Sequence, residues 1–454
     1  MNKKIDIAEG KKETVYAFAY SLASKAVTYL VLLVFANLYL AEEYGAGSFA
    51  FNIRNIVTIV AFIGIPDALI PFIVKKKKIG AILKTLILIN LAVLLAGIVI
   101  AFREPWIWPL VLTYPLVMLN SVGMAFWRAK SRYDIPYKAG FYSIILTLVA
   151  AYLLSGYGRV GVLGAYAAGN LISFIWTVYP IRGEIIGGFS GKLNFDEAKN
   201  YLKVAMVVVI IGSLFVINGW VNSTLLGIFG TYEQVADFGV SSSLAGIISI
   251  IPLSLSMFIL TRASQIRSKI KSKAVLYRTV RISFFLSLLA AIALTTIIPT
   301  ILHVFFPKYI DSAIYVFVFN IGMVFYASYN VIYSYYIGKT NPGKALVPVI
   351  LGLIINLGLA VGLLMEGYGV LGVAIASSVA NFAILLFLSM QESIKKIVLM
   401  SFFAVAAIAL SYYSGYFGAA VFVLTIPLSF ALGIITLEDF GIIRNVLRKI
   451  VYRN

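Results

Sequence analysis

The sequence predicts an all-α, polytopic membrane protein with about fourteen transmembrane helices. Of its 454 residues, 61% are hydrophobic and only 12% are charged. Soluble proteins have an apolar share of roughly one half, so a chain this apolar is expected to lie in a membrane. Long apolar stretches also alternate with short segments rich in Lys and Arg, which is typical of a chain that crosses the bilayer repeatedly.

Fourteen segments are long and apolar enough for an α-helix of about twenty residues to cross a bilayer. They lie near 14–40, 46–73, 79–101, 107–127, 138–155, 160–181, 200–228, 234–261, 277–303, 311–337, 345–365, 369–390, 396–413 and 416–437. A turn at 41–47 separates the first two. Only Ser414 and Gly415 divide the last two, so a re-entrant hairpin is the alternative there. The first segment is too long for the core of a signal peptide and is expected to be retained.

The distribution of Lys and Arg predicts the orientation, because cytoplasmic loops collect basic residues. With the N-terminus inside, all but five of the 37 basic residues fall in cytoplasmic segments. The exceptions are Arg103, Arg159 and Lys308 in outer segments, and Lys25 and Arg54 inside spans. We therefore expect both termini in the cytoplasm and place the protein in the plasma membrane.

The longest run of bases lies in a cytoplasmic segment. Seven Lys and Arg residues fall between positions 262 and 281. We expect the linker at 262–276 to move with the C-terminal bundle and to join no soluble domain, with the bases of the run attracted to anionic headgroups at about 1 kcal/mol each.

Several kinds of site are excluded by composition. Without cysteine there can be no disulfide, thiolate metal site or cysteine nucleophile, and the single histidine, His303, cannot form a metal cluster alone. The net charge of +19 is scattered between apolar spans instead of forming a basic groove with aromatic platforms, which argues against nucleic acid. No pair of carboxylates is placed to act as acid and base, so we expect no catalytic residue, metal or cofactor.

An internal repeat predicts two related halves. The stretch GYGRVGVLGAYAAGN at 156–170 returns as GYGVLGVAIASSVAN at 367–381. Both copies fit GxGxxG, but neither follows a strand, so we assign the glycines to a tight turn and close helix packing instead of nucleotide binding. The predicted domains are a six-helix bundle at 1–190, a second at 191–394, and a terminal helix pair with a cytoplasmic tail at 395–454.

Two cations inside the first two spans require an explanation. Lys25 and Arg54 each lie roughly 15 Å from the start of their predicted helices, near the middle of the membrane. A charge there costs about 2.5–3.5 kcal/mol and usually faces water, a partner or a substrate. Polar residues accompany both cations and are predicted to line a shared cavity: Ser21, Thr28, Asn52, Asn55 and Thr58.

The hypothesis is that Lys25 and Arg54 form an anion site. The alternative is structural, with Lys25 reaching to the membrane surface or either cation pairing with a buried carboxylate. Asp67 is the one carboxylate well inside this helical hairpin, which makes it the candidate for such an ion pair or for gating.

Two further stretches carry a resemblance to a known family: YLAEEYGAGSFAF at 39–51 and GIPDALIPFIVKKKK at 64–78. Together with the two six-helix repeats and the fourteenth helix, they resemble the Wzx-type oligosaccharide flippases, polysaccharide biosynthesis membrane proteins of the multidrug/oligosaccharidyl-lipid/polysaccharide superfamily. The resemblance covers the whole chain. It implies two bundles in a V around a central cavity, and a polyprenyl-diphosphate-linked sugar as the substrate moved to the outer leaflet.

The resemblance also bears on the site and on rival functions. Flippases of peptidoglycan precursors carry cavity-facing bases in helices one and two, which implies that Lys25 and Arg54 meet the diphosphate. Drug antiporters of the superfamily commonly use a carboxylate in helix one. None lies between Glu13 and Glu42, which argues against the alternative of an ion-coupled drug or solute exporter. An enzyme such as a glycan polymerase is a third interpretation, while the bilayer and glycan-assembly enzymes are the expected partners.

Overall fold

The computed structural model describes residues 29–62, 69, 73, 80–130, 132, 134–189, 220–250, 255–256, 259, 266, 268–339, 341–394 and 396–439. These residues form helices and short turns, and none of them lies in a strand. The chain divides into two compact units, Met1–Ala236 and Asp237–Asn454. The predicted limit of the first bundle at residue 190 stays a prediction, because residues 190–219 lie outside the described ranges.

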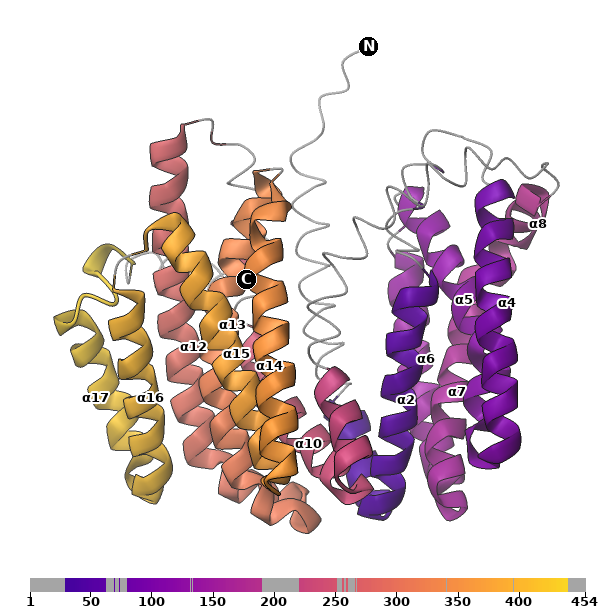
Figure 1. Ribbon diagram of the computed structural model, residues 1–454, viewed down its shortest axis with the longest axis horizontal. Coiled ribbons are helices and arrows are strands. Elements are labelled where there is room, and N and C mark those ends of the chain that lie inside the picture. Colours follow the sequence, from indigo (N-terminus) through magenta and orange to yellow (C-terminus); the bar gives the residue numbers. More distant parts are fainter. Residues whose placement is uncertain are drawn as a thin grey trace, which may run out of the picture. The chain divides into compact units, whose positions relative to one another are not determined.

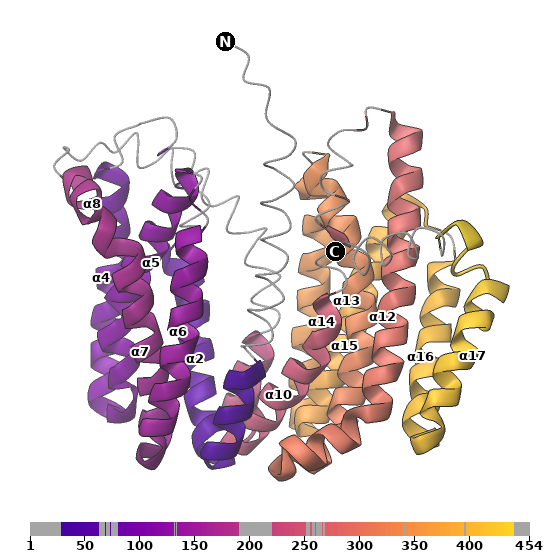
Figure 2. The ribbon, with the colours of Figure 1, turned by 180° about the vertical axis from the view of Figure 1, so that it is seen from behind.

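The first unit is a bundle of helices arranged around α7 (Gly158–Val178), which packs against α2, α5 and α6 (Figure 1). Figure 2 shows α7 running beside α6. Its other helices are Tyr29–Leu38, α2 (Ala41–Phe62), α4 (Gly80–Arg103), α5 (Trp108–Ala129), α6 (Asp134–Leu153), α8 (Arg182–Phe189) and Trp220–Phe229. The next helix, α10 (Tyr232–Ala245), crosses the limit between the units.

The core of this unit lies where α4, α5 and the end of α7 meet. Leu83 and Leu86 of α4 are fully buried against Val122 of α5. The polar groups among these helices are paired: Trp127 Nε1 donates to the carbonyl of Thr177 over 2.8 Å, and the Thr177 hydroxyl donates to Asn120 Oδ1 over 2.6 Å. Interhelical hydrogen bonds of this kind hold helices together where lipid gives no hydrophobic driving force.

The predicted turn at 41–47 is wrong, because α2 already begins at Ala41. Two acidic residues in its first turn, Glu42 and Glu43, suit the positive end of the helix dipole. The glycines serve packing instead. A Cβ at Gly45 would lie 1.6 Å from the carbonyl oxygen of Tyr232, and a Cβ at Gly47 would lie 2.4 Å from Cγ1 of Val162.

The second unit is built around α12 (Lys269–Phe305) and α13 (Ala313–Gly338). α13 packs against α12 and α15, and α15 packs against α14. The last helices, α16 and α17, lie side by side and both pack on α12 (Figures 1 and 2). The remaining bounds are α14 (Leu346–Met365), α15 (Gly369–Glu392), α16 (Ile397–Ser414) and α17 (Gly418–Ala431).

The described helices fit the predicted spans. Eight of them are long and apolar enough to cross a membrane. Four shorter apolar helices are Tyr29–Leu38, Lys138–Leu153, Trp220–Phe229 and Gly418–Ala431. Together with α2 and α10, they place a helix in each of the fourteen predicted spans. The predicted class, an all-α multi-pass membrane protein, is confirmed.

The repeated GYG stretches share one glycine conformation and one packing position. Gly158 and Gly369 occupy equivalent positions of the repeat, and their φ angles of +53° and +50° lie in the left-handed region that favours glycine. Three residues later, Gly161 and Gly372 both lie in close packing, where an added Cβ would come within 2.0 Å of the Leu154 carbonyl oxygen and 2.8 Å of Leu363 Cβ. The repeat therefore places a glycine of positive φ and a closely packed glycine at equivalent positions in both copies.

Replacing Gly45 by Ala should destabilise the first unit. The new Cβ would meet the backbone of Tyr232, which cannot rotate away, and overpacking of this kind costs about 1–3 kcal/mol. Gly156→Ala is the matched control, since no atom lies within 4 Å of its added Cβ. Thermal unfolding of the two variants in detergent measures the difference. Equal melting temperatures would show that the contact is not tight.

Candidate functional site

Arg54 lies in the second half of α2, which begins at Ala41. Thirteen residues of α-helix separate the two positions and correspond to about 20 Å. The other charged members of the predicted site, Lys25 and Asp67, lie outside the described residues, as do Ser21 and Thr28. The pairing of Lys25 with Arg54 therefore stays a prediction.

The guanidinium of Arg54 is only partly satisfied. Its Nη2 donates to Oδ1 of Asn55 over 3.0 Å, and its Cζ lies 4.4 Å from the centre of the Phe51 ring. Nε and Nη1 are buried and have no hydrogen-bond partner in the part of the chain that the structure describes. Within that same part, none of the ion pairs involves Arg54. Arg54 is thus a half-buried cation whose two buried nitrogens have no hydrogen-bond partner among the described residues.

Stacked aromatic rings lie beside Arg54. Phe51 stacks on Tyr166 of α7 with ring centres 4.1 Å apart, and Tyr166 stacks on Phe35 at 5.1 Å. A ring face attracts a cation by about 0.5–2 kcal/mol. This attraction is weaker than a salt bridge in a dry interior, so the rings position the guanidinium without neutralising it.

Two tyrosines bring further helices to the site. Tyr166 of α7 and Tyr114 of α5 are close enough to interact electrostatically with Arg54. Tyr114 donates its hydroxyl proton to Oδ1 of Asn90 over 2.7 Å, and Asn90 Nδ2 donates to the carbonyl of Leu86, also over 2.7 Å. These contacts link α2, α4, α5 and α7 into one polar cluster. Tyr166, Tyr114 and Asn90 were not among the predicted site residues, although Asn90 is a polar residue in an otherwise apolar span.

The predicted lining residues of α2 separate into two groups. Asn55 contacts Arg54 directly, and Thr58 lies about 40° from Arg54 around the helix axis. The Thr58 hydroxyl is buried and makes no hydrogen bond with any described residue. Asn52 instead donates to Ser223 over 2.9 Å and so joins α2 to the helix Trp220–Phe229.

The chemistry available here is anion binding. A guanidinium with free donors matches the oxygen pairs of phosphates and carboxylates, and it stays charged at any pH a cell experiences. Among the described residues, no three His, Asp or Glu side chains are grouped to hold a metal ion.

Solved structures resemble this chain over most of its length. A lipid II flippase, MurJ, in an inward closed conformation superposes with a TM-score of 0.75 at 15% identity, covering 96% of this chain and 100% of that one. An inward-facing multidrug resistance MATE family transporter of the MOP superfamily gives 0.64 at 17% identity, covering 82% and 96%. A MATE structure in the bent conformation gives 0.54 at 14% identity, covering 87% and 97%.

The sequence itself matches no protein-family model and no curated protein. At the identities of the structural matches, the likeness concerns the fold. The second of these structures belongs to the superfamily that the sequence resembles. The chain therefore has the fold that this transporter and MurJ share, in agreement with the predicted fold.

Proposed function

We propose that this protein is a flippase that carries a polyprenyl-diphosphate-linked oligosaccharide from the cytoplasmic to the outer leaflet, for surface polysaccharide or glycoprotein glycan assembly. The observation that carries the proposal is the guanidinium of Arg54 on α2, which has two buried nitrogens without a hydrogen-bond partner among the described residues and forms no ion pair with a described carboxylate. A buried charge without compensation is costly, and a bound anion would supply the compensation.

A diphosphate suits this site on physical grounds. Its two phosphates offer several oxygens to the fork of donors on Arg54, and Lys25 would add a second positive charge. The lipid tail would stay in the bilayer while the charged head crosses about 30 Å of hydrocarbon. Tyr166 and Tyr114 are our candidates for contacts with the sugar.

Transport would proceed by alternating access, with one bundle moving relative to the other around the bound head group. The membrane potential would assist, because each negative charge moving out of a negative interior gains about 2.3 kcal/mol per 100 mV. The likeness to a lipid II flippase supports this function. We place the protein in the plasma membrane with both termini in the cytoplasm, and we expect its partners to be the enzymes that assemble the glycan.

The alternative is an ion-coupled drug or solute exporter, which the likeness to MATE transporters supports. Such an exporter needs an ionisable acid to couple cation movement to transport. The first predicted span contains none, and Arg54 would repel a cationic drug. The solved structures that this chain resembles are a flippase and transporters, so we propose no enzymatic activity for this protein.

Removing the cation should stop flipping. Arg54→Ala is expected to slow movement of a fluorescent polyprenyl diphosphate lipid in proteoliposomes by about 10- to 100-fold, the equivalent of one or two charge-assisted hydrogen bonds. Arg54→Lys should retain part of the rate because the charge remains. Arg159→Ala is the control, since Arg159 forms an exposed ion pair with Glu42. Wild-type rates for both Arg54 variants would make this cation structural.

Lys25 should act on the same anion. Lys25→Asp is expected to flip more slowly than Lys25→Ala, because the new carboxylate repels the diphosphate as well as removing a positive charge. The assay is the same, at matched protein levels. If the two variants are equally active, Lys25 takes no part in binding the anion.

The proposed orientation can be tested with single cysteines, since the chain has none of its own. Cysteines replacing the exposed residues Glu233 and Glu366 should react with an impermeant thiol reagent added to intact cells. A cysteine replacing the exposed Lys271 should react only after the cells are opened. Labelling at position 271 in sealed cells would contradict cytoplasmic termini.

A further inference from the structure

α12 is longer than a bilayer requires. Its 37 residues correspond to about 55 Å of helix, whereas the hydrocarbon is about 30 Å thick. The first part of α12, from Lys269 to Arg281, belongs to the run of seven bases between positions 262 and 281, which we expected lipid headgroups to attract. The structure instead pairs several of these bases with carboxylates of the same unit.

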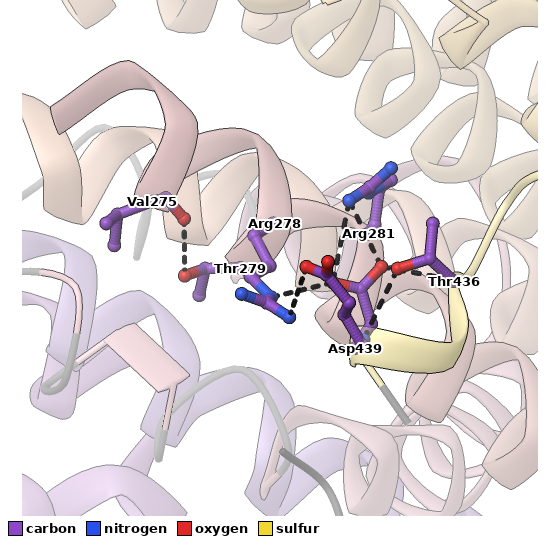
Figure 3. Close-up of polar contacts among 7 residues, drawn as sticks. Val275, Arg278, Thr279, Arg281, Thr436 and Asp439 are labelled. Carbon is purple, nitrogen blue, oxygen red and sulfur yellow. Dashed lines mark hydrogen bonds and ion pairs between the residues drawn. The ribbon is translucent and has the colours of Figure 1, made fainter. Parts of the chain in front are cut away.

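The most buried of these carboxylates is Asp439, whose side chain is 1% exposed. Arg278 Nε lies 2.8 Å from its Oδ1, and Arg281 Nη2 lies 3.1 Å from its Oδ2. Figure 3 shows the two guanidinium groups converging from α12 on this one carboxylate. Two charge-assisted contacts from adjacent helical turns fix the position of Asp439 against α12.

Asp439 also organises the chain that follows α17. The backbone N–H of Thr436 donates to Asp439 Oδ2 over 3.1 Å, and the N–H of Asp439 donates back to the Thr436 hydroxyl over 3.3 Å. This reciprocal pair has the pattern of a capping box. Before it, the chain turns at Gly433, with φ +64°, and buries Ile434 and Ile435 almost completely. We call residues 432–439 the C-terminal turn.

A second carboxylate binds the same stretch of α12. Lys273 Nζ lies 3.0 Å from Oε2 of Glu392, whose side chain is 5% exposed at the end of α15. The Tyr277 hydroxyl donates to the backbone carbonyl of Glu392. By contrast, Lys271, also on α12, is exposed and takes part in none of the ion pairs among the described residues.

Contacts farther along α12 hold the terminal helices α16 and α17. The Thr296 hydroxyl lies 3.0 Å from that of Ser411 in α16, and the Ser411 hydroxyl donates to the carbonyl of Ile292 over 3.2 Å. A Cβ added at Gly418, the first residue of α17, would lie 2.2 Å from Thr296 Oγ1. Thus the terminal pair is attached to α12 at two separate levels: through Ser411 and Gly418 beside Thr296, and through Asp439 after the end of α17.

We propose that Arg278 and Arg281 of α12, together with Asp439, form a clamp that joins the terminal helices α16 and α17 to the rest of the second unit, while Lys273 and Tyr277 attach the same stretch of α12 to Glu392 at the end of α15. The terminal pair then moves with α12 as one rigid body, and it is not an independent hairpin in the lipid. Headgroup attraction alone does not explain the arrangement, because it would favour exposed bases over bases paired with buried carboxylates.

Hydrogen exchange measured by mass spectrometry on the full chain in lipid nanodiscs tests the clamp. Asp439→Asn should raise amide exchange in residues 432–439 by about tenfold or more while leaving α13 unchanged, because loss of the charge frees both arginines. Glu438→Gln is the matched control, since Glu438 is 85% exposed and lies 3.4 Å from Arg278. Equal exchange in these two variants would overturn the proposal.

A milder pair of variants keeps the test decisive if Asp439→Asn fails to fold. Arg278→Gln leaves Arg281 on the carboxylate, so exchange in the C-terminal turn should rise less but still measurably. Lys271→Gln changes a base on the same helix that has no described ion pair and should have no effect. Indistinguishable exchange in Arg278→Gln and Lys271→Gln would also overturn the clamp.

Cross-linking tests the rigid body itself. In the variant Thr296→Cys/Gly418→Cys, the two Cβ atoms start about 3.0 Å apart, near the 3.5–4.5 Å that a disulfide needs. If the terminal pair moves with α12, the oxidised protein should transport lipid at the rate of the reduced protein. Loss of transport on oxidation that a reductant restores would overturn the proposal. The exchange experiment remains decisive even if the protein transports no lipid.

Discussion

A membrane interior offers no water to satisfy polar groups, and this constraint governs the polar side chains of the whole chain. Polar side chains of the described helices pair with one another or with backbone carbonyls. Tyr114 donates to Asn90, and Asn320 Nδ2 donates to Thr295 across two helices over 2.9 Å. Some buried polar atoms have no hydrogen-bond partner among the described residues, and two of them belong to the guanidinium of Arg54, which forms no ion pair there. We propose that a ligand would complete the structure at this cation.

Arginine side chains have two different environments in the described part of this chain. Arg278 and Arg281 are paired with the buried carboxylate of Asp439 and serve to attach helices. Arg54 meets an aromatic ring and an amide, which position it but leave its charge available. We infer that the presence or absence of a carboxylate partner distinguishes a structural cation from a binding one in this protein.

Apolar length was sufficient to predict the helices, because a transmembrane span needs only about twenty suitable residues. Glycine was misleading at 41–47, where Gly45 and Gly47 serve close helix packing and not a turn. Arg54 could be identified as a candidate site residue from the sequence alone, because a charge inside an apolar span is costly in any orientation. Tyr166 and Tyr114 could not, since their proximity to Arg54 depends on how distant helices pack. The partner of Arg278 lies 161 positions along the chain, which local sequence patterns do not reveal.

The central claim is that Arg54 recognises the diphosphate of a lipid-linked substrate. Native mass spectrometry on the wild-type protein and the Arg54→Gln variant can compare the affinities for a polyprenyl diphosphate and for the uncharged polyprenol of equal length. We predict that the substitution weakens binding of the diphosphate lipid by about tenfold or more and leaves polyprenol binding unchanged. An equal effect on both lipids, or on neither, would contradict this account.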